Sequence, residues 1–185
     1  MNNAGRNLIT VTGLSGSGTS TTCKLLSRET GLEYIYAGAL FREMAAENNM
    51  DVESFGVHAE THPEIDRELD DKMIDRARQG NAIIEGRMIS CLVRENNIPA
   101  LTVLINADTD VRAQRVSGRE HLDRKSAQNK ITDRDERDRK RYYDLYGLDP
   151  LENKWYNIII DNSELTPEET CRKILDLYER LADGE

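Results

Sequence analysis

The sequence predicts an α/β protein in which a five-stranded parallel sheet lies between two layers of helices, a three-layer sandwich. Short runs of β-branched and other apolar residues alternate along the chain with longer segments of helical periodicity. Such alternation is typical of parallel strands, because each strand must return through a helical crossover to the same end of the sheet. With 185 residues, the chain suits a single domain with a sizeable core.

Each expected strand is a short apolar segment with a turn residue or a polar residue at its end. The first is the sequence LITVT, Leu8 to Thr12, which runs directly into Gly13. The remaining four follow the same pattern at wide intervals, with helical segments between them. The expected strands are residues 8–12, 33–36, 82–85, 100–106 and 156–161.

Glycine and proline mark several of the helix ends. Gly31 and Gly80 follow helical segments and stop them, whereas Pro63 suits the first turn of a helix. The expected helices are residues 18–30, 39–48, 51–60, 64–79, 109–118, 126–146 and 167–182. The polar segment from Arg119 to Lys130 is expected to be weakly structured and mobile.

The charged residues are unevenly distributed. The formal net charge is -9, which argues against binding to a nucleic acid polymer, since such binding relies on a positive field. Many of the cations nevertheless fall between residues 112 and 141. They are Arg112, Arg115, Arg119, Arg124, Lys125, Lys130, Arg134, Arg137, Arg139, Lys140 and Arg141. This segment indicates either a site for a small polyanion or a solvated pair of charged helices.

Neither a membrane segment nor a disulfide framework is expected. No apolar run reaches the roughly 18 residues of a membrane span, and Met1 to Asn7 lacks the apolar stretch of a signal peptide. Cys23, Cys91 and Cys171 are widely and irregularly spaced, as reduced thiols are. We therefore expect a cytoplasmic protein that does not bind membranes. The apolar helix stripes are accounted for by the core, so we also expect a monomer.

A phosphate-binding loop is predicted between the first strand and the first helix. Residues 13–20 match the pattern G-x-x-x-x-G-K-[ST] except at Thr19, where lysine is usual. Small residues let backbone N–H groups converge on phosphate oxygens, and the helix dipole favours the same anion. The Ser20 hydroxyl is expected to bind Mg²⁺. The expected site for the nucleoside triphosphate, the phosphoryl donor, comprises Gly13, Leu14, Ser15, Gly16, Ser17, Gly18, Thr19, Ser20 and Thr21. A plain Gly/Ser turn is the alternative interpretation.

Phosphoryl transfer needs a second phosphate site for the acceptor. Arg42 follows the second strand, and Gly86 and Arg87 follow the third, so they should lie with the loop at the carboxyl edge of the sheet. Arginine suits a monophosphate because its guanidinium donates two parallel hydrogen bonds. Glu85 ends the third strand and is expected to orient magnesium through water. Asp66 either contacts a base amino group or is an ordinary surface carboxylate.

The cationic segment is interpreted as a lid over the phosphates. On a helix, Arg134, Arg137 and Arg141 share one face, and Arg119 follows Gly118 at a possible hinge. Arginines on a closing lid exclude water and stabilise the transferring phosphoryl group. They would compensate for Thr19, which otherwise indicates a nucleotide binder without catalysis. The interspersed acidic residues are expected to keep the helix solvated when the lid is open. They are Asp133, Asp135, Glu136 and Asp138.

Several motifs together resemble the archaeal-type cytidylate kinases. They are GSGTST at 16–21, AGALFREMA at 37–45, HPEIDRELD at 62–70, IIEGR at 83–87 and RDERDRKRYYDLYGLD at 134–149. The resemblance covers most of the chain and implies a P-loop nucleoside monophosphate kinase fold with a helical lid. It also implies transfer from ATP to CMP or dCMP with Mg²⁺. In this family threonine commonly replaces the P-loop lysine.

The resemblance also assigns parts of the chain to roles. It implies one domain over residues 1–185, with a core at 6–117 and 147–183, a lid at about 118–146 and monophosphate-binding helices at about 37–80. Arg119, Arg134 and Arg141 match the family's lid arginines, and Arg137 is an addition. By analogy, Asn162 and Ser163 lie near the adenine of ATP. A kinase for another monophosphate and a regulatory nucleotide binder without catalysis remain the alternatives.

Overall fold

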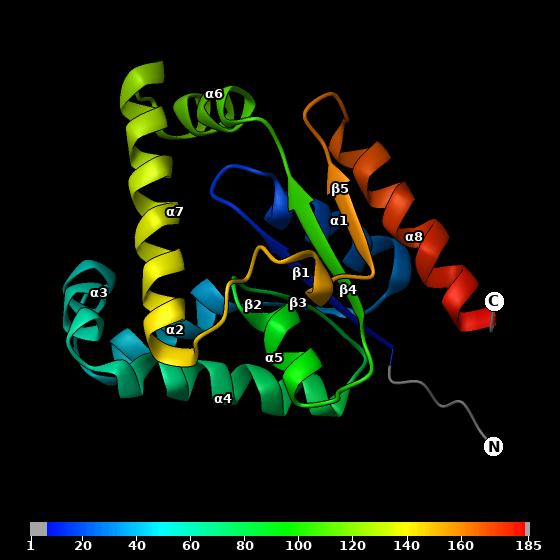
Figure 1. Cartoon of the computed structure of the whole chain (residues 1–185), viewed down its shortest axis with the longest axis horizontal. Helices are drawn as coiled ribbons and strands as arrows, with labels where there is room; N and C mark the ends of the chain where they lie inside the picture. The colour runs from blue at the N-terminus through cyan, green and yellow to red at the C-terminus, as the bar shows by residue number, and fades with distance from the viewer. Residues whose placement is uncertain (1–6, 184–185) are drawn as a thin grey trace.

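The computed structural model of the chain describes residues 7–183, and its centre is a five-stranded parallel sheet (Figure 1). The strands are β1 (Leu8–Gly13), β2 (Glu33–Tyr36), β3 (Ala82–Glu85), β4 (Leu101–Asn106) and β5 (Ile158–Asp161). Their order across the sheet is β2-β3-β1-β4-β5, and all neighbouring pairs are parallel. The predicted fold class is therefore confirmed. Of the predicted domain, residues 1–6 and 184–185 lie outside the described part, including Arg6, where the expected core begins.

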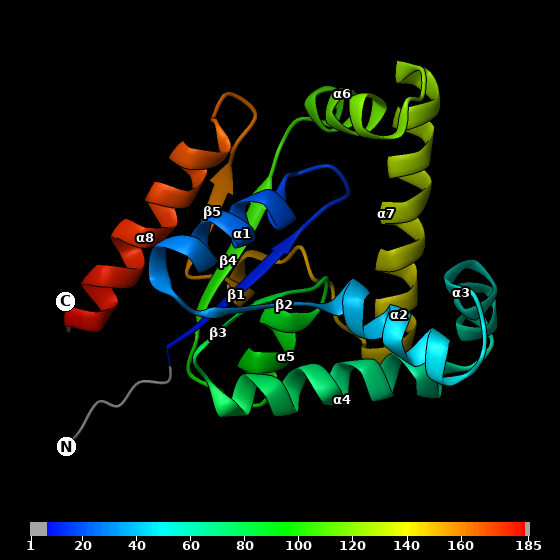
Figure 2. The ribbon, with the colours of Figure 1, turned by 180° about the vertical axis from the view of Figure 1, so that it is seen from behind.

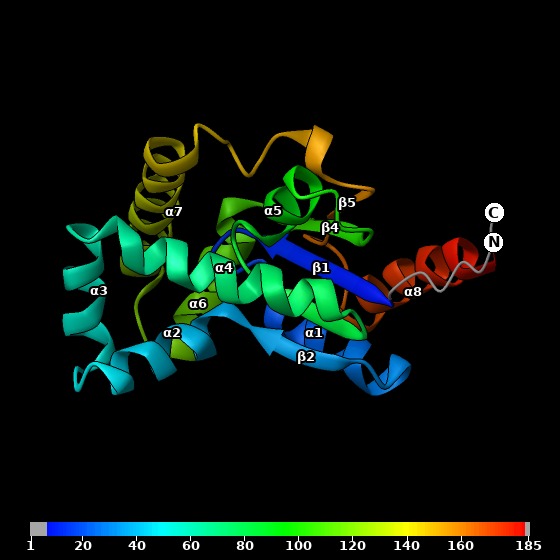
Figure 3. The ribbon, with the colours of Figure 1, turned by 90° about the horizontal axis from the view of Figure 1, so that it is seen from below.

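Helices cover both faces of this sheet, which gives the three predicted layers. The helices are α1 (Thr19–Thr30), α2 (Ala37–Glu47), α3 (Val52–Glu60), α4 (Pro63–Gln79), α5 (Ile89–Glu95), α6 (Thr109–Glu120), α7 (Arg124–Tyr146) and α8 (Pro167–Asp183), with a 3-10 turn η1 (Asn153–Trp155). Helices α1 and α8 pack together on one face, and α4 and α5 lie on the other (Figure 3). Within residues 7–183 no helix combines the length and apolar character that a membrane crossing requires.

Alternation along the strands divides the core between the two faces. Leu8 and Ile84 belong to the cluster beneath α4 and α5, whereas their neighbours Ile9 and Ile83 belong to the cluster beneath α1 and α8. This follows from the period of two in a strand, where successive side chains point to opposite faces. All four side chains are at most 2% exposed. The strands are apolar on both faces because helices cover both faces.

The helix α5 and the turn η1 are absent from the sequence prediction. Five consecutive residues of α5, from Ile89 to Val93, are buried. A short helix that is buried all round lacks the apolar and polar faces by which a sequence pattern identifies helices. The last strand also begins at Ile158 rather than at residue 156. Before it, the Asn157 side chain accepts the backbone N–H of Thr102, so regular strand pairing starts one residue later.

The prediction of weak structure between Arg119 and Lys130 is wrong. Helix α6 continues to Glu120, and α7 begins at Arg124 after a short connection. The Asp123 carboxylate caps α7 by accepting the backbone N–H of Ser126 at 3.0 Å. Apolar residues of the two helices also pack on each other in a small separate cluster; these are Ala113, Val116, Ala127 and Ile131. The sequence prediction missed this cluster because the segment is mostly polar, and a few apolar residues are enough to pack two helices together.

The long helix α7 extends from α6 toward the helices α2, α3 and α4, across the side of the sheet that carries the glycine-rich loop (Figure 2). Its last turns are attached to α4, since the Tyr146 hydroxyl donates to Asp70 Oδ2 at 2.7 Å. Tyr142 belongs to the core cluster beneath α4 and α5. The helix therefore bridges α6 and α4 over the carboxyl ends of the central strands, where ligands of open parallel sheets bind.

Candidate active site

The loop between β1 and α1 requires glycine for two different reasons. Gly16 and Gly18 have φ of 82° and 88°, a left-handed conformation that residues with a side chain rarely adopt. A Cβ atom at Gly13 would lie 2.5 Å from Ser17 Oγ and 2.6 Å from the carbonyl oxygen of Ile105. Gly18 also caps α1 without a side chain, which leaves the first N–H groups of the helix available for an anion.

Three arginines bind backbone carbonyl groups of this loop. Their guanidinium groups donate to the carbonyl oxygens of alternate loop residues. The pairs are Arg87 with Gly13 at 2.9 Å, Arg112 with Ser15 at 3.0 Å and Arg115 with Ser17 at 3.3 Å. These hydrogen bonds fix the orientation of the peptide planes in the loop. Positive charge also surrounds the loop although the usual lysine is absent.

Glu85 connects the loop to β3 and β2. Its side chain, in a residue 6% exposed, accepts hydrogen bonds from Thr19 Oγ1 at 2.5 Å, from Ser20 Oγ at 2.8 Å and from the Tyr34 hydroxyl. Burial and the hydrogen bond with Glu85 raise the pKa of Tyr34, so this phenol remains a neutral donor. Thr19, in the place of the lysine, therefore faces the carboxylate rather than open solvent. Ser20 and Glu85, the two residues predicted to serve magnesium, thus lie within hydrogen-bond distance of each other.

The oxygen atoms of Ser20 and Glu85 fit a magnesium ion that is held mainly by nucleotide phosphates. Magnesium prefers oxygen ligands and usually binds through one or two protein groups together with phosphates and water. Among the described residues no cluster of three or more acidic, histidine or cysteine side chains forms a metal site. The Ser20 hydroxyl and the Glu85 carboxylate are oxygen groups of the kind that bind magnesium together with phosphates.

One cleft of about 1250 Å³ joins the loop to α7 and to the helices α2–α4. The four predicted lid arginines all line it; they are Arg119, Arg134, Arg137 and Arg141. The loop contributes Gly13, Leu14, Ser15, Gly16, Thr19 and Ser20, and the far side includes Val57, Pro63, Asp66 and Arg67. Glu85, Gly86 and Arg87 line the floor between them. A cleft of this size exceeds that of an ordinary single-ligand pocket and suits two ligands.

Of the two predicted acceptor arginines, only Arg87 lines the cleft. The Arg42 guanidinium carbon lies 5.7 Å from the centre of the Tyr36 ring, and Arg42 itself is exposed on α2. Arg42 is not among the residues that line the cleft, although its neighbour Phe41 is. The structure therefore brings Arg87 to the loop and leaves Arg42 on the outer side of the adjoining helix.

Asp66 is a buried cleft residue rather than an ordinary surface carboxylate. It is 4% exposed, and its Oδ2 atom lies 3.5 Å from Arg141 Nε of α7. Neither of these two atoms has a hydrogen-bond partner within the described part of the chain. Burial raises the pKa of Asp66, and the positive charge of Arg141 partly opposes this. Asp66 Oδ2 and Arg141 Nε therefore retain hydrogen-bonding capacity for a ligand in the cleft.

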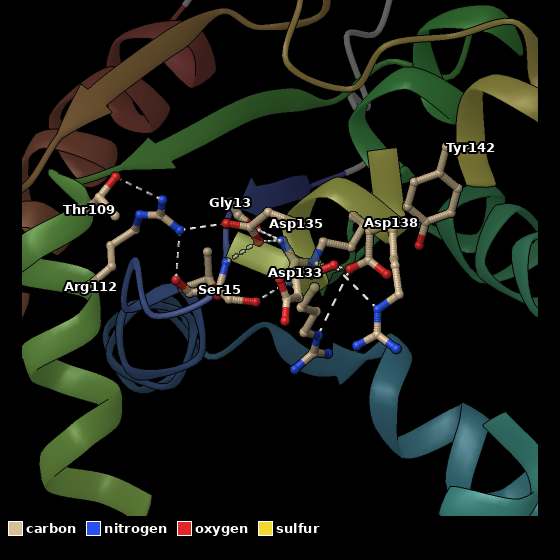
Figure 4. A network of polar contacts seen from close by, with 12 residues as sticks. Gly13, Ser15, Thr109, Arg112, Asp133, Asp135, Asp138 and Tyr142 are labelled. Atoms are coloured by element: carbon tan, nitrogen blue, oxygen red, sulfur yellow. Dashed lines mark hydrogen bonds and ion pairs between the residues drawn. The ribbon is translucent and has the colours of Figure 1, made fainter. Parts of the chain in front are cut away.

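Four acidic residues of α7 are expected to be solvated, and for Asp135 and Asp138 this expectation is wrong. Asp135 accepts the backbone N–H of Ser15 at 3.0 Å, and its two oxygens lie 3.3 Å from Arg87 Nη1 and 2.6 Å from Arg112 Nη1 (Figure 4). Asp138 forms ion pairs with Arg87, Arg134 and Arg141. Asp133 and Glu136 are exposed as expected. Two carboxylates on one helix face therefore bind the arginines of the site.

Sequence reasoning missed Arg112, Arg115 and Asp135 as site residues. The two arginines lie in α6, which begins just after the carboxyl end of β4. The same rule that pointed to Arg87, a position after a central strand, would have identified them. No comparable signal exists for Asp135, because only the position of α7 in space brings this residue to the loop.

Asn162, which the resemblance places near adenine, lies beside the loop between β1 and α1. It is 3% exposed, and its Nδ2 donates to the carbonyl oxygen of Ser17 at 2.9 Å while Arg115 binds its side-chain and backbone oxygens. Ser163 is one residue further and accepts the backbone N–H of Asp108 with its hydroxyl at 2.8 Å. Both residues thus connect the end of β5 with the loop and with the start of α6.

Comparison with known proteins supports one family. The sequence model of the cytidylate kinase-like family matches residues 8–164. Among curated proteins, the cytidylate kinase of Pyrococcus abyssi is 43% identical over 161 residues, which are 87% of this chain and 87% of that protein. The cytidylate kinase of Methanopyrus kandleri is 38% identical over an alignment of 185 positions that covers 96% of each chain.

Solved structures support the fold. A protein from Eubacterium ventriosum has a TM-score of 0.74 at 19% identity and covers 93% of this chain and 98% of its own. The shikimate kinase of Bacteroides thetaiotaomicron has a TM-score of 0.64 at 16% identity, with the same coverage. At such identities the likeness concerns the kinase fold alone. The family model matches most of this chain, and curated cytidylate kinases are about 40% identical to it. The chain therefore belongs to the cytidylate kinase-like family.

Proposed function

We propose that the protein is a cytidylate kinase that transfers the γ-phosphoryl group of ATP to CMP or dCMP, giving ADP and CDP or dCDP. The observation that carries this proposal is the single cleft that joins the glycine-rich loop, the lid arginines and a second set of residues on α3 and α4. In-line transfer between two nucleotides needs both phosphate ends in one enclosed space. A protein that only binds a nucleotide has no need for the second half of such a cleft.

At the donor end, the residues Gly13 to Thr21 bind the phosphates of ATP, largely through backbone N–H groups and the N-terminus of α1. Asn162 and Ser163 lie on the adenine side. Ser20 and Glu85 hold Mg²⁺ together with the phosphates, the carboxylate acting through water. When bound, this ion supplies positive charge that offsets the negative charge of the transferring group.

At the lid, Arg119, Arg134, Arg137 and Arg141 provide the cations that a P-loop lysine provides elsewhere. All four line the cleft on the side of α6 and α7. Cationic groups that surround the transferring phosphoryl stabilise its charge and keep water from competing as the acceptor. Stabilisation of this kind is worth on the order of 10³-fold or more in rate, which suffices to offset the neutral side chain of Thr19.

At the acceptor end, Gly86 and Arg87 take the monophosphate and Asp66 takes the base. Cytosine carries an amino group beside two acceptor atoms, and uracil carries a carbonyl oxygen at the amino position. The free oxygen of Asp66 suits the amino group, and the free Nε of Arg141 suits a neighbouring acceptor. Arg42 remains a proposed monophosphate ligand that would have to turn from Tyr36 toward the cleft.

We also propose that the enzyme acts in the cytoplasm as a monomer. Its three cysteines are Cys23, Cys91 and Cys171, and all of them are free and buried. Free thiols suit a reducing compartment, where both of its nucleotide substrates are present. The molar mass in solution, measured by light scattering during gel filtration, tests the monomer, since a stable dimer has twice the mass of the chain.

A panel of acceptors tests the proposed reaction. ATP and Mg²⁺ are supplied with CMP, dCMP, UMP, AMP or dTMP, and the release of ADP is followed by a coupled assay. CMP or dCMP is expected to give the highest kcat/KM. Preference for another monophosphate would support the alternative kinase, and no turnover with any acceptor would refute the kinase reaction altogether.

Exchange of Asp66 for asparagine tests base recognition. An amide both accepts and donates hydrogen bonds, so Asp66→Asn is expected to lower the preference for CMP over UMP by about tenfold or more, which is the range of one hydrogen bond with a charged group. The matched control is Asp71→Asn, which changes an exposed carboxylate of the same helix. An unchanged preference in a folded Asp66 variant would remove this residue from base recognition.

A further inference from the structure

The contacts of Asp135 have the form of a phosphate site that is filled by a carboxylate. One backbone N–H of the glycine-rich loop and two guanidinium groups converge on its two oxygens, at 2.6 to 3.3 Å. Loop N–H groups and arginines are the donors that proteins use for phosphate oxygens. The Asp135 side chain is only 13% exposed, so it points inward although it belongs to a polar helix.

Asp135 neutralises the positive charges of Arg87 and Arg112 beside the loop. The Arg112 side chain is 7% exposed, and a buried cation needs an anionic partner. Asp135 is the carboxylate with which it pairs within the described residues. Arg87 also pairs with Asp138, which is shared with Arg134 and Arg141. If Asp135 moved away, Arg112 would have no carboxylate partner among the described residues, and Arg87 would share Asp138 with Arg134 and Arg141. This excess of positive charge would attract another anion.

We propose that Asp135 is an internal stand-in for a donor phosphate: it fills the anion site of the loop in the nucleotide-free enzyme and is displaced by the phosphates of the nucleoside triphosphate. The identity of the nucleotide rests on the proposed function. The exchange of anions rests only on the contacts of Asp135. While it is bound, Asp135 keeps Arg87 and Arg112 in position beside the loop. Asp135 is therefore a positioning residue.

The exchange couples nucleotide binding to the lid. Asp135 lies in the middle of α7, and its contacts attach this helix to the loop. A donor phosphate that takes the Ser15 N–H and the Arg112 guanidinium releases that attachment and leaves Arg87 to the acceptor monophosphate, so the lid arginines on the same helix become free to surround the nucleotide. When the product leaves, the carboxylate returns and neutralises the arginines again. A ligand shifts such an equilibrium only by its preference for one state, so removal of the internal anion must strengthen phosphate binding.

Inorganic tripolyphosphate is the probe, because it carries the phosphates without a base or a sugar. Asp135→Asn keeps the size of the side chain and removes its charge. The full-length variant is expected to bind tripolyphosphate about tenfold or more tightly than the unmodified protein by calorimetry, the range of a hydrogen bond with a charged group. Glu136→Gln is the matched control, since it removes one charge from the next, exposed position of the same helix. It should change the affinity by less than about twofold, as expected of a screened surface charge.

Thermal unfolding separates an anion site from an ordinary structural ion pair. For Asp135→Asn we expect a lower midpoint without ligand and a larger increase with tripolyphosphate than for the unmodified protein, because the probe replaces the missing charge. If the variant is unfolded at the temperature of the assay, tripolyphosphate should refold it. Equal or weaker binding by the folded variant, or no refolding of an unfolded one, would overturn the inference. Because no turnover is measured, failure of the proposed kinase reaction would leave these results unaffected.

Discussion

Arg112 offers a quantitative test of how the loop is held. Its side chain is 7% exposed, and its guanidinium binds the carbonyl oxygens of Ser15 and Ala107 at 3.0 and 3.2 Å and Asp135 Oδ2 at 2.6 Å. These partners belong to the loop, to the segment after β4 and to the lid helix. Arg112→Ala therefore removes one group that joins three separate parts of the site.

The expected cost follows from burial. Removing one partner of a buried ion pair costs about 3–5 kcal/mol, because the other charge remains without compensation. Asp135 keeps Ser15 N–H and Arg87 as partners and is itself 13% exposed, so the lower end of this range applies, about 3 kcal/mol. For a chain of this length, that corresponds to a decrease of about 6–12 °C in the midpoint of thermal unfolding.

Urea unfolding followed by circular dichroism measures the effect. Arg112→Lys retains the charge but cannot reach all three partners, so its loss of stability should lie between those of the alanine variant and the unmodified protein. Arg172→Ala, at an exposed position of α8, is the control and should change the stability by less than about 0.5 kcal/mol. A loss below about 1 kcal/mol for Arg112→Ala, with an unchanged denaturant slope, would refute this account of the loop.

Further predictions concern catalysis and pH. Arg87→Ala should lower kcat by about 10³-fold and also weaken ATP binding, since Arg87 donates to Gly13 of the loop; an unchanged kcat would remove it from the site. Thr19→Lys should not accelerate turnover, because the new cation would face Glu85 and other cations already surround the phosphates; a large gain in kcat would contradict this. Burial raises the pKa of Asp70 to about 6 from its usual 3.8. The folded state thus binds this proton more tightly, so its contribution to stability grows as the pH falls from about 6 to 4. Asp70→Asn should therefore be more stable than the unmodified protein at pH 8, by up to about 3 kcal/mol, with the difference lost near pH 4; equal stability at both pH values would exclude this.

The sequence by itself determined the fold class and the position of the glycine-rich loop. Strands that are apolar on both faces, helices between them and the spacing of Gly13, Gly18 and Ser20 are local properties, so they can be read without knowledge of the rest of the chain. Position after a central strand likewise pointed to Glu85 and Arg87, which the structure brings to the loop. Prediction from local sequence pattern missed α5, which is almost completely buried. It also missed the ordered connection between α6 and α7, where apolar residues are few.

Only the tertiary structure decided which charges meet. Arg42 and Arg87 both follow neighbouring strands, yet one guanidinium lies against Tyr36 and the other binds the loop. The alternating charges of α7 suggest a solvated helix, but the placement of that helix over the loop buries Asp135 against Arg112. Pairing between residues far apart in sequence depends on how elements pack. Charge compensation at this site is therefore a property of the assembled fold and not of any segment.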